Sequence, residues 1–116
     1  MHELGLVFHI IKAVKETAEE NSVSKVTAVT MQIGEVSGVL PDYLEDCWNW
    51  AVKREGPLLN EAKLCWEILP ALTHCGSCGT NYPTVKYAKI CPNCGSEETW
   101  LLIGNEFSIK EIEVPD

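Results

Sequence analysis

Apolar residues recur every three or four positions over the first twenty residues of the chain. Spacing of this kind places side chains on one face of an amphipathic helix. The repeating positions are Leu4, Val7, Phe8, Ile11, Val14 and Ala18. Polar Asn21 and Ser22 follow, so we expect the helix to end there.

After Lys25 the period changes, and apolar residues alternate with polar ones. This alternation predicts a half-buried β-strand, because successive side chains of a strand point to opposite faces. The apolar positions are Val29, Met31 and Ile33. The glycines at positions 34 and 38 are expected to loosen the chain that follows.

A second helix is predicted from Pro41, which suits the first turn of a helix. Asp42 and Glu45 carry the negative charge that the amino end of a helix favours. Apolar residues at helical spacing mark its buried face, namely Leu44, Cys47, Trp48, Ala51 and Val52. We expect this helix to stop before Gly56 and Pro57.

Two further strands are predicted, one around Leu64, Trp66 and Ile68 that ends at Pro70, and one that begins at Phe107. In the last strand the alternation slips at Lys110–Glu111, which indicates a bulge or an early end. The fold class is therefore α+β: a small sheet of about three strands with two helices on one face, and a cysteine-rich module inserted before the last strand. We expect two domains, residues 1–70 plus 105–116 and residues 71–104.

The inserted module contains two Cys-x-x-Cys pairs, Cys75–Cys78 and Cys91–Cys94, separated by twelve residues. Four cysteines at this spacing predict a tetrahedral thiolate site for Zn(II). Such a site is closed, so the zinc is expected to be structural. Glycine follows each pair and is expected to aim backbone N–H groups at the sulfurs. Disulfides or a thioredoxin-like redox pair would need an oxidising compartment or a βαβ context.

Composition narrows the class of protein. The 116 residues are 46% hydrophobic and 22% charged, which is typical of one folded domain with at most one small module. The start lacks the pattern of a secretory signal, and no apolar run reaches the ~18 residues of a membrane span, so we expect a cytoplasmic protein that does not bind membranes. The net charge of -8 disfavours nucleic acid as a partner.

The chain begins Met1-His2-Glu3. If Met1 is retained, its amine, the amide and imidazole nitrogens of His2 and the amide of Glu3 form a compact set of nitrogen donors. Planar nitrogen donors suit Ni(II) or Cu(II). By itself, however, a histidine at position 2 is most often an ordinary terminal residue.

Each of the remaining histidines and unpaired cysteines could have a functional role or an ordinary structural one. His9 could add a donor but is expected to be a helix histidine, partly buried or solvated. His74 could replace a thiolate or respond to pH, or it could be an exposed turn residue. Cys47 is expected to be a small buried side chain, and Cys65 lies on the opposite face of its strand.

Several motifs together resemble the HypA/HybF family of hydrogenase nickel-incorporation proteins. They are Met1-His2-Glu3-Leu4, Ile33-Gly34-Glu35-Val36-Ser37-Gly38-Val39, the two cysteine pairs, Cys94-Gly95-Ser96 and Gly104-Asn105-Glu106. The resemblance implies a metallochaperone, not an enzyme, in which Met1, His2 and Glu3 bind the transported Ni(II) and the four cysteines bind zinc. It also implies two partners, the [NiFe]-hydrogenase large-subunit precursor and a nickel-binding maturation GTPase. The chain has no phosphate-binding loop of its own.

Three alternatives remain from the sequence. A zinc ribbon that binds nucleic acid normally carries clustered basic residues. The module has only Lys86 and Lys89, and the negative charges of Glu97 and Glu98 balance them, so its net charge is not positive. A redox or hydrolytic enzyme would need a recognisable nucleophile motif. An adaptor of the same complexes would have no nickel site at all.

Overall fold

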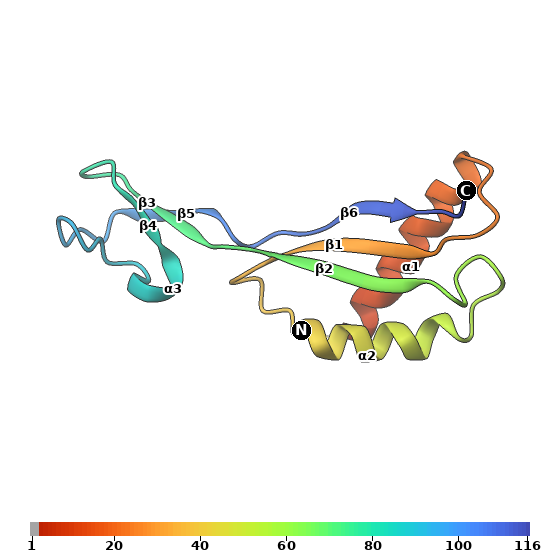
Figure 1. Cartoon of the computed structure of the whole chain (residues 1–116). Helices are drawn as coiled ribbons and strands as arrows, with labels where there is room; N and C mark the ends of the chain where they lie inside the picture. Colours follow the sequence, from red (N-terminus) through yellow and green to blue (C-terminus); the bar gives the residue numbers. More distant parts are fainter. Residues whose placement is uncertain (1–2) are drawn as a thin grey trace. The chain divides into compact units, whose positions relative to one another are not determined.

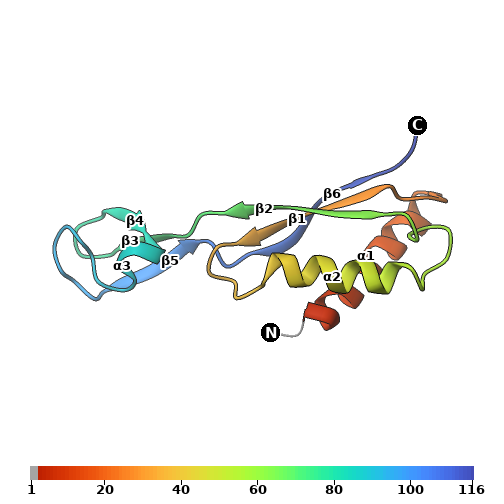
Figure 2. The same cartoon turned by 60° about the horizontal axis from the view of Figure 1, so that its bottom comes forward.

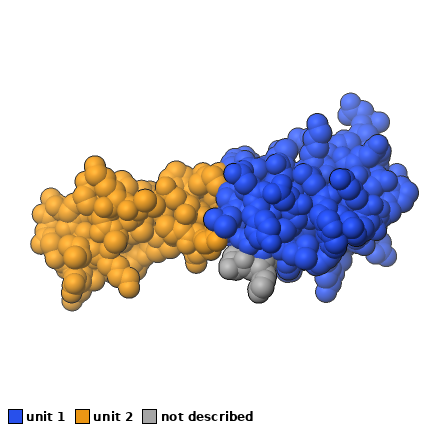
Figure 3. Space-filling model, turned by 90° about the horizontal axis from the view of Figure 1, so that it is seen from below, with its two compact units in different colours: residues 1–32, 39–67, 108–116 blue, residues 33–38, 68–107 orange. Residues whose placement is uncertain are grey.

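The computed structural model describes residues 3–116 and forms two compact units (Figure 3). Unit 1 contains the residues up to 32, 39–67 and 108–116, and unit 2 contains residues 33–38 and 68–107. The elements along the chain are α1 (Glu3–Glu20), β1 (Ala28–Gly34), α2 (Pro41–Val52), β2 (Lys63–Leu69), β3 (Leu72–Cys75), β4 (Asn81–Pro83), α3 (Thr84–Tyr87), β5 (Thr99–Ile103) and β6 (Phe107–Glu113). The predicted split into domains stays a prediction, since compactness alone does not show independent folding.

The α+β fold class is confirmed. Strands β2, β1 and β6 form a three-stranded sheet in that order, and α1 and α2 cover one face of it (Figures 1 and 2). Strand β6 continues through Lys110–Glu111 to Glu113, so the early end proposed for it is wrong. Val29, Met31 and Ile33 of β1 are buried, as their alternation predicted.

The buried face of α1 differs in part from the prediction. Val7, Ile11, Val14 and Ala18 are buried, but Leu4 and Phe8 are 38% and 48% exposed. Phe8 follows Val7 by one residue and therefore lies about 100° further around the helix, outside the buried stripe. The stripe is completed instead on its other side by Ile10, which is also buried.

Helix α2 packs as predicted, with all five residues of its apolar face buried. Trp48 is fully buried, and its indole Nε1 donates a hydrogen bond to the carbonyl oxygen of Ala62 at 2.9 Å. The neighbouring Trp50 is exposed, and the Arg54 guanidinium lies 3.8 Å from the centre of its ring. The helix therefore presents one apolar face to the core and one mixed aromatic face to solvent.

Unit 2 has a second three-stranded sheet in the order β4-β3-β5, with both pairs antiparallel. The pattern of apolar and polar residues did not predict these short strands. Thr73 of β3 pairs with Leu101 of β5, and its hydroxyl lies 2.6 Å from that of Thr84. Tyr82 of β4 donates its hydroxyl proton to the carbonyl oxygen of Ala88 at 2.9 Å. Side-chain hydrogen bonds from β3 and β4 therefore hold both ends of the short helix α3 close to the sheet.

Three separate segments of unit 2 meet at what we call the glycine contact, made by Gly34, Gly104 and Ala71. The Gly34 amide donates to the Glu106 carbonyl at 2.7 Å, and the Val36 amide donates to the Gly104 carbonyl at 2.8 Å. A Cβ at Gly34 would lie 2.1 Å from the Gly104 oxygen, and one at Gly104 would lie 2.4 Å from the Ala71 Cβ. The expectation that Gly34 loosens the chain is therefore wrong, because its lack of a side chain permits a close backbone approach.

Two glutamates fix the same region. Glu35 Oε1 accepts the amide of Ala71 at 2.8 Å, and Glu106 Oε1 accepts the amide of Gly104 at 2.7 Å. Each carboxylate satisfies a backbone donor that no strand ladder satisfies. The motifs Ile33-Gly34-Glu35 and Gly104-Asn105-Glu106 are therefore explained by one shared contact.

A four-cysteine candidate metal centre

The four cysteines of unit 2 converge on one point. Their sulfur atoms all lie within 4.8 Å of one another, and the Cys75–Cys94 and Cys78–Cys91 separations are both 3.6 Å. A tetrahedron with Zn–S bonds of ~2.3 Å has sulfurs ~3.8 Å apart. The set therefore fits a zinc ion, and four thiolates would leave no coordination position open to water or substrate.

Each cysteine pair is shaped by the same backbone turn. In the first, the Cys75 amide donates to the Thr80 carbonyl at 2.9 Å, and the Gly79 amide donates to the Cys75 carbonyl at 2.8 Å. The second turn repeats both bonds, Cys91 to Ser96 at 3.0 Å and Gly95 to Cys91 at 2.8 Å. Gly79 and Gly95 have φ of +80° and +76°, as expected of glycine. Their own amides are directed at carbonyl oxygens, but other backbone N–H groups of the turns point at the sulfurs as predicted, and that of Asn93 donates to Cys91 Sγ at 3.4 Å.

Other groups approach the sulfurs. The side-chain amide of Asn93 donates to Cys78 Sγ at 3.5 Å, and Thr80 Oγ1 lies 3.2 Å from the same sulfur. Together these contacts, Asn93 first, lower the pKa of the Cys78 thiol to about 5. At Cys94 the amide of Ser96 lowers the pKa, but the neighbouring thiols, Cys75 foremost, outweigh it and raise the pKa to about 12. The two exposed thiols of the site therefore differ in acidity, and Cys78 is the more acidic of the two.

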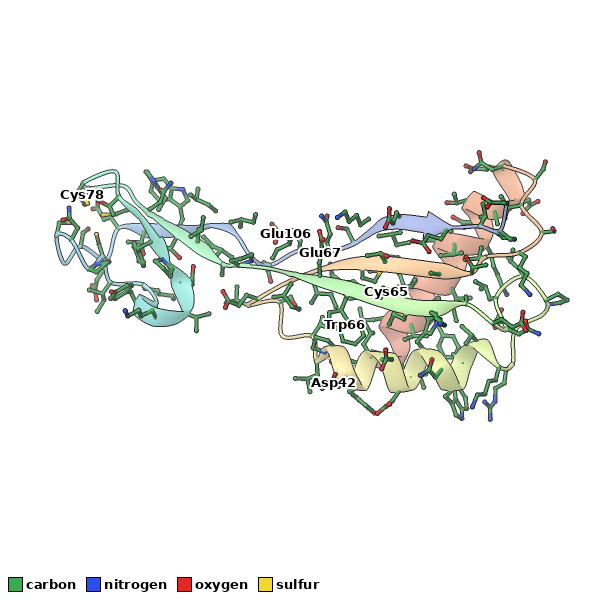
Figure 4. The ribbon with its side chains drawn as sticks, viewed as in Figure 1. Asp42, Cys65, Trp66, Glu67, Cys78 and Glu106 are labelled. Carbon is green, nitrogen blue, oxygen red and sulfur yellow. The ribbon has the colours of Figure 1, made fainter. Side chains whose placement is uncertain are left out.

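The site is open on one side. Cys75 and Cys91 are buried and form a small core with Tyr82, whereas Cys78 and Cys94 are exposed. Figure 4 shows Cys78 in the turn that follows β3. An ion can therefore enter past the second cysteine of each pair, while the first cysteine anchors the site to the sheet.

The other candidate residues lie outside this cluster. His74 is in strand β3 and not in a turn; its Nδ1 lies 2.6 Å from Asn81 Oδ1, and its ring centre is 5.0 Å from that of Trp100. His9 is exposed on α1. Within residues 3–116, the four cysteines are the one group of three or more metal-binding side chains close enough to share an ion.

The two cysteines outside the pairs behave as ordinary residues of unit 1. Cys47 is buried on α2, as predicted, and Cys65 is exposed on β2 (Figure 4). Neither has a catalytic histidine among the contacts found in the described chain. Over the same residues, no helix has the length and apolar character needed to cross a membrane.

The predicted nickel ligands lie at the edge of what the structure describes. Met1 and His2 are outside the described residues. Glu3 is the first residue of α1, and its side chain is buried with only 3% exposed. Its carboxylate Oε2 accepts the Leu40 amide at 3.2 Å, which ties the start of α1 to the start of α2.

Comparison with known proteins identifies relatives over the whole length. Residues 1–114 match the family described as "Hydrogenase/urease nickel incorporation, metallochaperone, hypA". The chain is 37% identical over 116 residues to the hydrogenase maturation factor HypA of Trichormus variabilis, covering 100% of this chain and 97% of that protein. It is 36% identical over 114 residues to that of Geobacter metallireducens, covering 98% and 99%.

A solved structure shares the fold. The solution structure of the nickel metallochaperone HypA from Helicobacter pylori superposes with a TM-score of 0.73, covering 98% of this chain and 97% of that one at 23% sequence identity. A second solution structure, of a HypA protein, gives a TM-score of 0.74 at 22% identity. These two similarities support the fold, while the family match carries the function.

Proposed function

This chain belongs to the HypA family of hydrogenase and urease nickel-incorporation metallochaperones, and on that premise we propose how it binds nickel and where it delivers it. Members of this family carry a metal and do not catalyse a reaction. The proposal rests above all on the full-length family match of a chain that begins Met1-His2-Glu3. The alternatives of a nucleic-acid-binding ribbon and of an enzyme lose their support.

Nickel binds at the amino end, through the Met1 amine, the amide and imidazole nitrogens of His2 and the amide nitrogen of Glu3. The first amides of a helix have no acceptor within the helix. Glu3 begins α1, so its amide is free of the helical ladder and can be deprotonated. Its carboxylate is already bound to the Leu40 amide. Glu3 therefore contributes a backbone nitrogen, and its side chain ties the start of α1 to Leu40.

The four-cysteine site holds a structural zinc ion. A module of this size buries little apolar surface, and its central core is Cys75, Cys91 and Tyr82. Structural zinc can supply on the order of 10 kcal/mol of folding free energy. The ion thus stabilises a zinc-ribbon domain, residues 71–104, beside a nickel-binding domain, residues 1–70 plus 105–116.

Delivery is a transfer of an ion and not a change of covalent bonds. The recipient is the [NiFe]-hydrogenase large-subunit precursor in the cytoplasm, and a nickel-binding GTPase of the same maturation system supplies the nucleotide chemistry. Ligand nitrogens must be deprotonated to hold the metal, so protonation of the terminus releases it. Nickel affinity should therefore fall as the pH is lowered.

The decisive experiment is a Ni(II) titration of untagged, zinc-loaded protein, followed by its visible absorption. Wild type should bind about one equivalent with the d–d band of a planar nitrogen site. His2→Ala and a chain extended before Met1 should both lose that band. His9→Ala is the matched control, because it removes an exposed histidine of α1 and should leave binding intact.

If the extended chain and His2→Ala bind nickel as wild type does, the terminal site is wrong. If none of the proteins binds nickel, the chain is better described as an adaptor within the same maturation complexes.

A further inference from the structure

Unit 2 carries a groove that neither metal site uses. It has a volume of about 430 Å³ and lies between α3, with the two residues after it, and strand β5. Thr73 of β3 lines it, together with Thr84 and Lys89 on one side and residues 99–101 on the other. The groove therefore lies wholly within unit 2 and follows β5.

Strand β5 is an unusual edge strand. It lies at one end of the sheet order β4-β3-β5, so one side of its backbone has no partner strand in the described chain. Its sequence, residues 99–103, contains no charged residue and no proline. Natural edge strands normally carry charge, proline or a cover that prevents pairing. An uncharged edge beside a groove is suited to accept another extended strand.

Half of the residues that line the groove are apolar, namely Val36, Ala88, Trp100 and Leu101. Trp100, Leu101 and Val36 all line it and are 54%, 39% and 38% exposed. The indole of Trp100 is held in place, because it packs against the backbone of Gly76 and the ring of His74. A segment paired with β5 would therefore meet the Trp100 ring on one face of the strand and Leu101 on the other, and would lose little free energy in ordering the ring.

Charge gives the groove a polarity. Lys86 and Lys89 are the only lysines of unit 2, which has no arginine, and Lys89 lines the groove. No acidic residue of the described chain lines it. Lys89 is therefore the one charged residue of the described chain that lines the groove, and its ammonium can pair with a carboxylate.

We propose that this groove binds an extended apolar segment of a partner protein that pairs with the outer edge of β5 and places an acidic residue beside Lys89. Backbone hydrogen bonds to β5 supply affinity, and the lysine selects segments that end in negative charge. A second copy of β5 would also bring acidic residues, because Glu97 and Glu98 directly precede the strand, so the test below distinguishes it from a partner protein. The inference depends on the ribbon alone and not on the nickel site.

The test uses two synthetic peptides with the zinc-loaded, full-length chain. Both alternate valine and threonine; one ends in two aspartates and the other in two lysines. The acidic peptide should shift the backbone amide resonances of residues 84–89 and 99–103 and bind saturably in fluorescence anisotropy. The lysine-ended peptide should bind about tenfold more weakly.

Variants assign the contacts. Lys89→Glu should weaken the acidic peptide about tenfold and strengthen the lysine-ended one, while Lys53→Glu, the same charge change at an exposed site of unit 1, should do neither. Leu101→Asp should abolish binding of the acidic peptide, and unchanged zinc content and amide dispersion confirm that it folds. Equal binding of both peptides, shifts confined to other residues, or no saturable binding would overturn the proposal. Concentration-dependent shifts of residues 99–103 without peptide would also overturn it, because a second copy would then occupy the strand.

Discussion

Replacing Gly34 by alanine tests whether the glycine contact stabilises unit 2. The new Cβ would lie 2.1 Å from the Gly104 carbonyl oxygen, and contacts below 3.0 Å essentially do not occur, so one backbone segment must move by at least 0.9 Å (3.0 minus 2.1). That movement separates the Val36–Gly104 and Gly34–Glu106 hydrogen bonds, now 2.8 and 2.7 Å.

The expected cost follows from these two effects. Overpacking a well-packed site costs about 1–3 kcal/mol. Each backbone hydrogen bond contributes about 1 kcal/mol to stability. Gly34→Ala should therefore lower the free energy of unfolding by about 3–5 kcal/mol, a large part of the ~5–15 kcal/mol of a typical domain.

Gly38→Ala is the matched control. Gly38 has φ +82° but no atom within 4 Å of a Cβ, so alanine there meets strain alone and should cost about 1–2 kcal/mol. The measurement is urea unfolding of the zinc-loaded proteins, combined with hydrogen exchange at the amides of Val36 and Gly104. If the two variants unfold at the same urea concentration, the close approach at Gly34 does not stabilise the protein and our reasoning is wrong.

Three further outcomes are expected. In reduced, metal-free protein at pH 7, iodoacetamide should modify Cys78, with its pKa of about 5, well before Cys94, with its pKa of about 12; peptide mass mapping that finds equal rates would contradict this order. Because the Cys94 thiol must lose its proton to bind zinc, lowering the pH should weaken zinc binding and raising it should strengthen it, which a competition titration with a chelator measures. Trp48→Phe should lower the free energy of unfolding by about 1–3 kcal/mol, because the buried Ala62 carbonyl loses its hydrogen-bond donor. Thermal unfolding measures this change, and a decrease in the free energy of unfolding below ~0.5 kcal/mol would show that the hydrogen bond does not stabilise the protein.

The parts of the fold that could be predicted are the helices and strands whose apolar residues repeat regularly and pack against a single core. Helix α2 and strand β1 have a polar face and an apolar face in strict period, so their buried residues follow from spacing. The buried face of α1 could be predicted only in part, because Leu4, Phe8 and Ile10 widen the apolar surface of the helix and its neighbours in the fold select which side is buried.

Other features depend on contacts that sequence spacing does not contain. Strands β3 and β4 are four and three residues long, too short for an alternation to be recognised. The role of Gly34 depends on Gly104, seventy residues away in the chain, and no local pattern relates the two. The four cysteines were predictable because their own spacing is the signal, whereas the nickel ligands, suggested by their nitrogen donors, became the leading hypothesis only through the resemblance.

The geometry of the ribbon also has a consequence for the unfolded protein. Cys78 and Cys91 are separated by twelve residues, and their sulfurs meet at one point. An ion that stays bound to both acts as a crosslink and removes the entropy of an open loop, about 3 kcal/mol for a loop of this length. A chain unfolded with its metal retained is therefore already partly organised, and the two turns have only to close over the ion for the ribbon to form again.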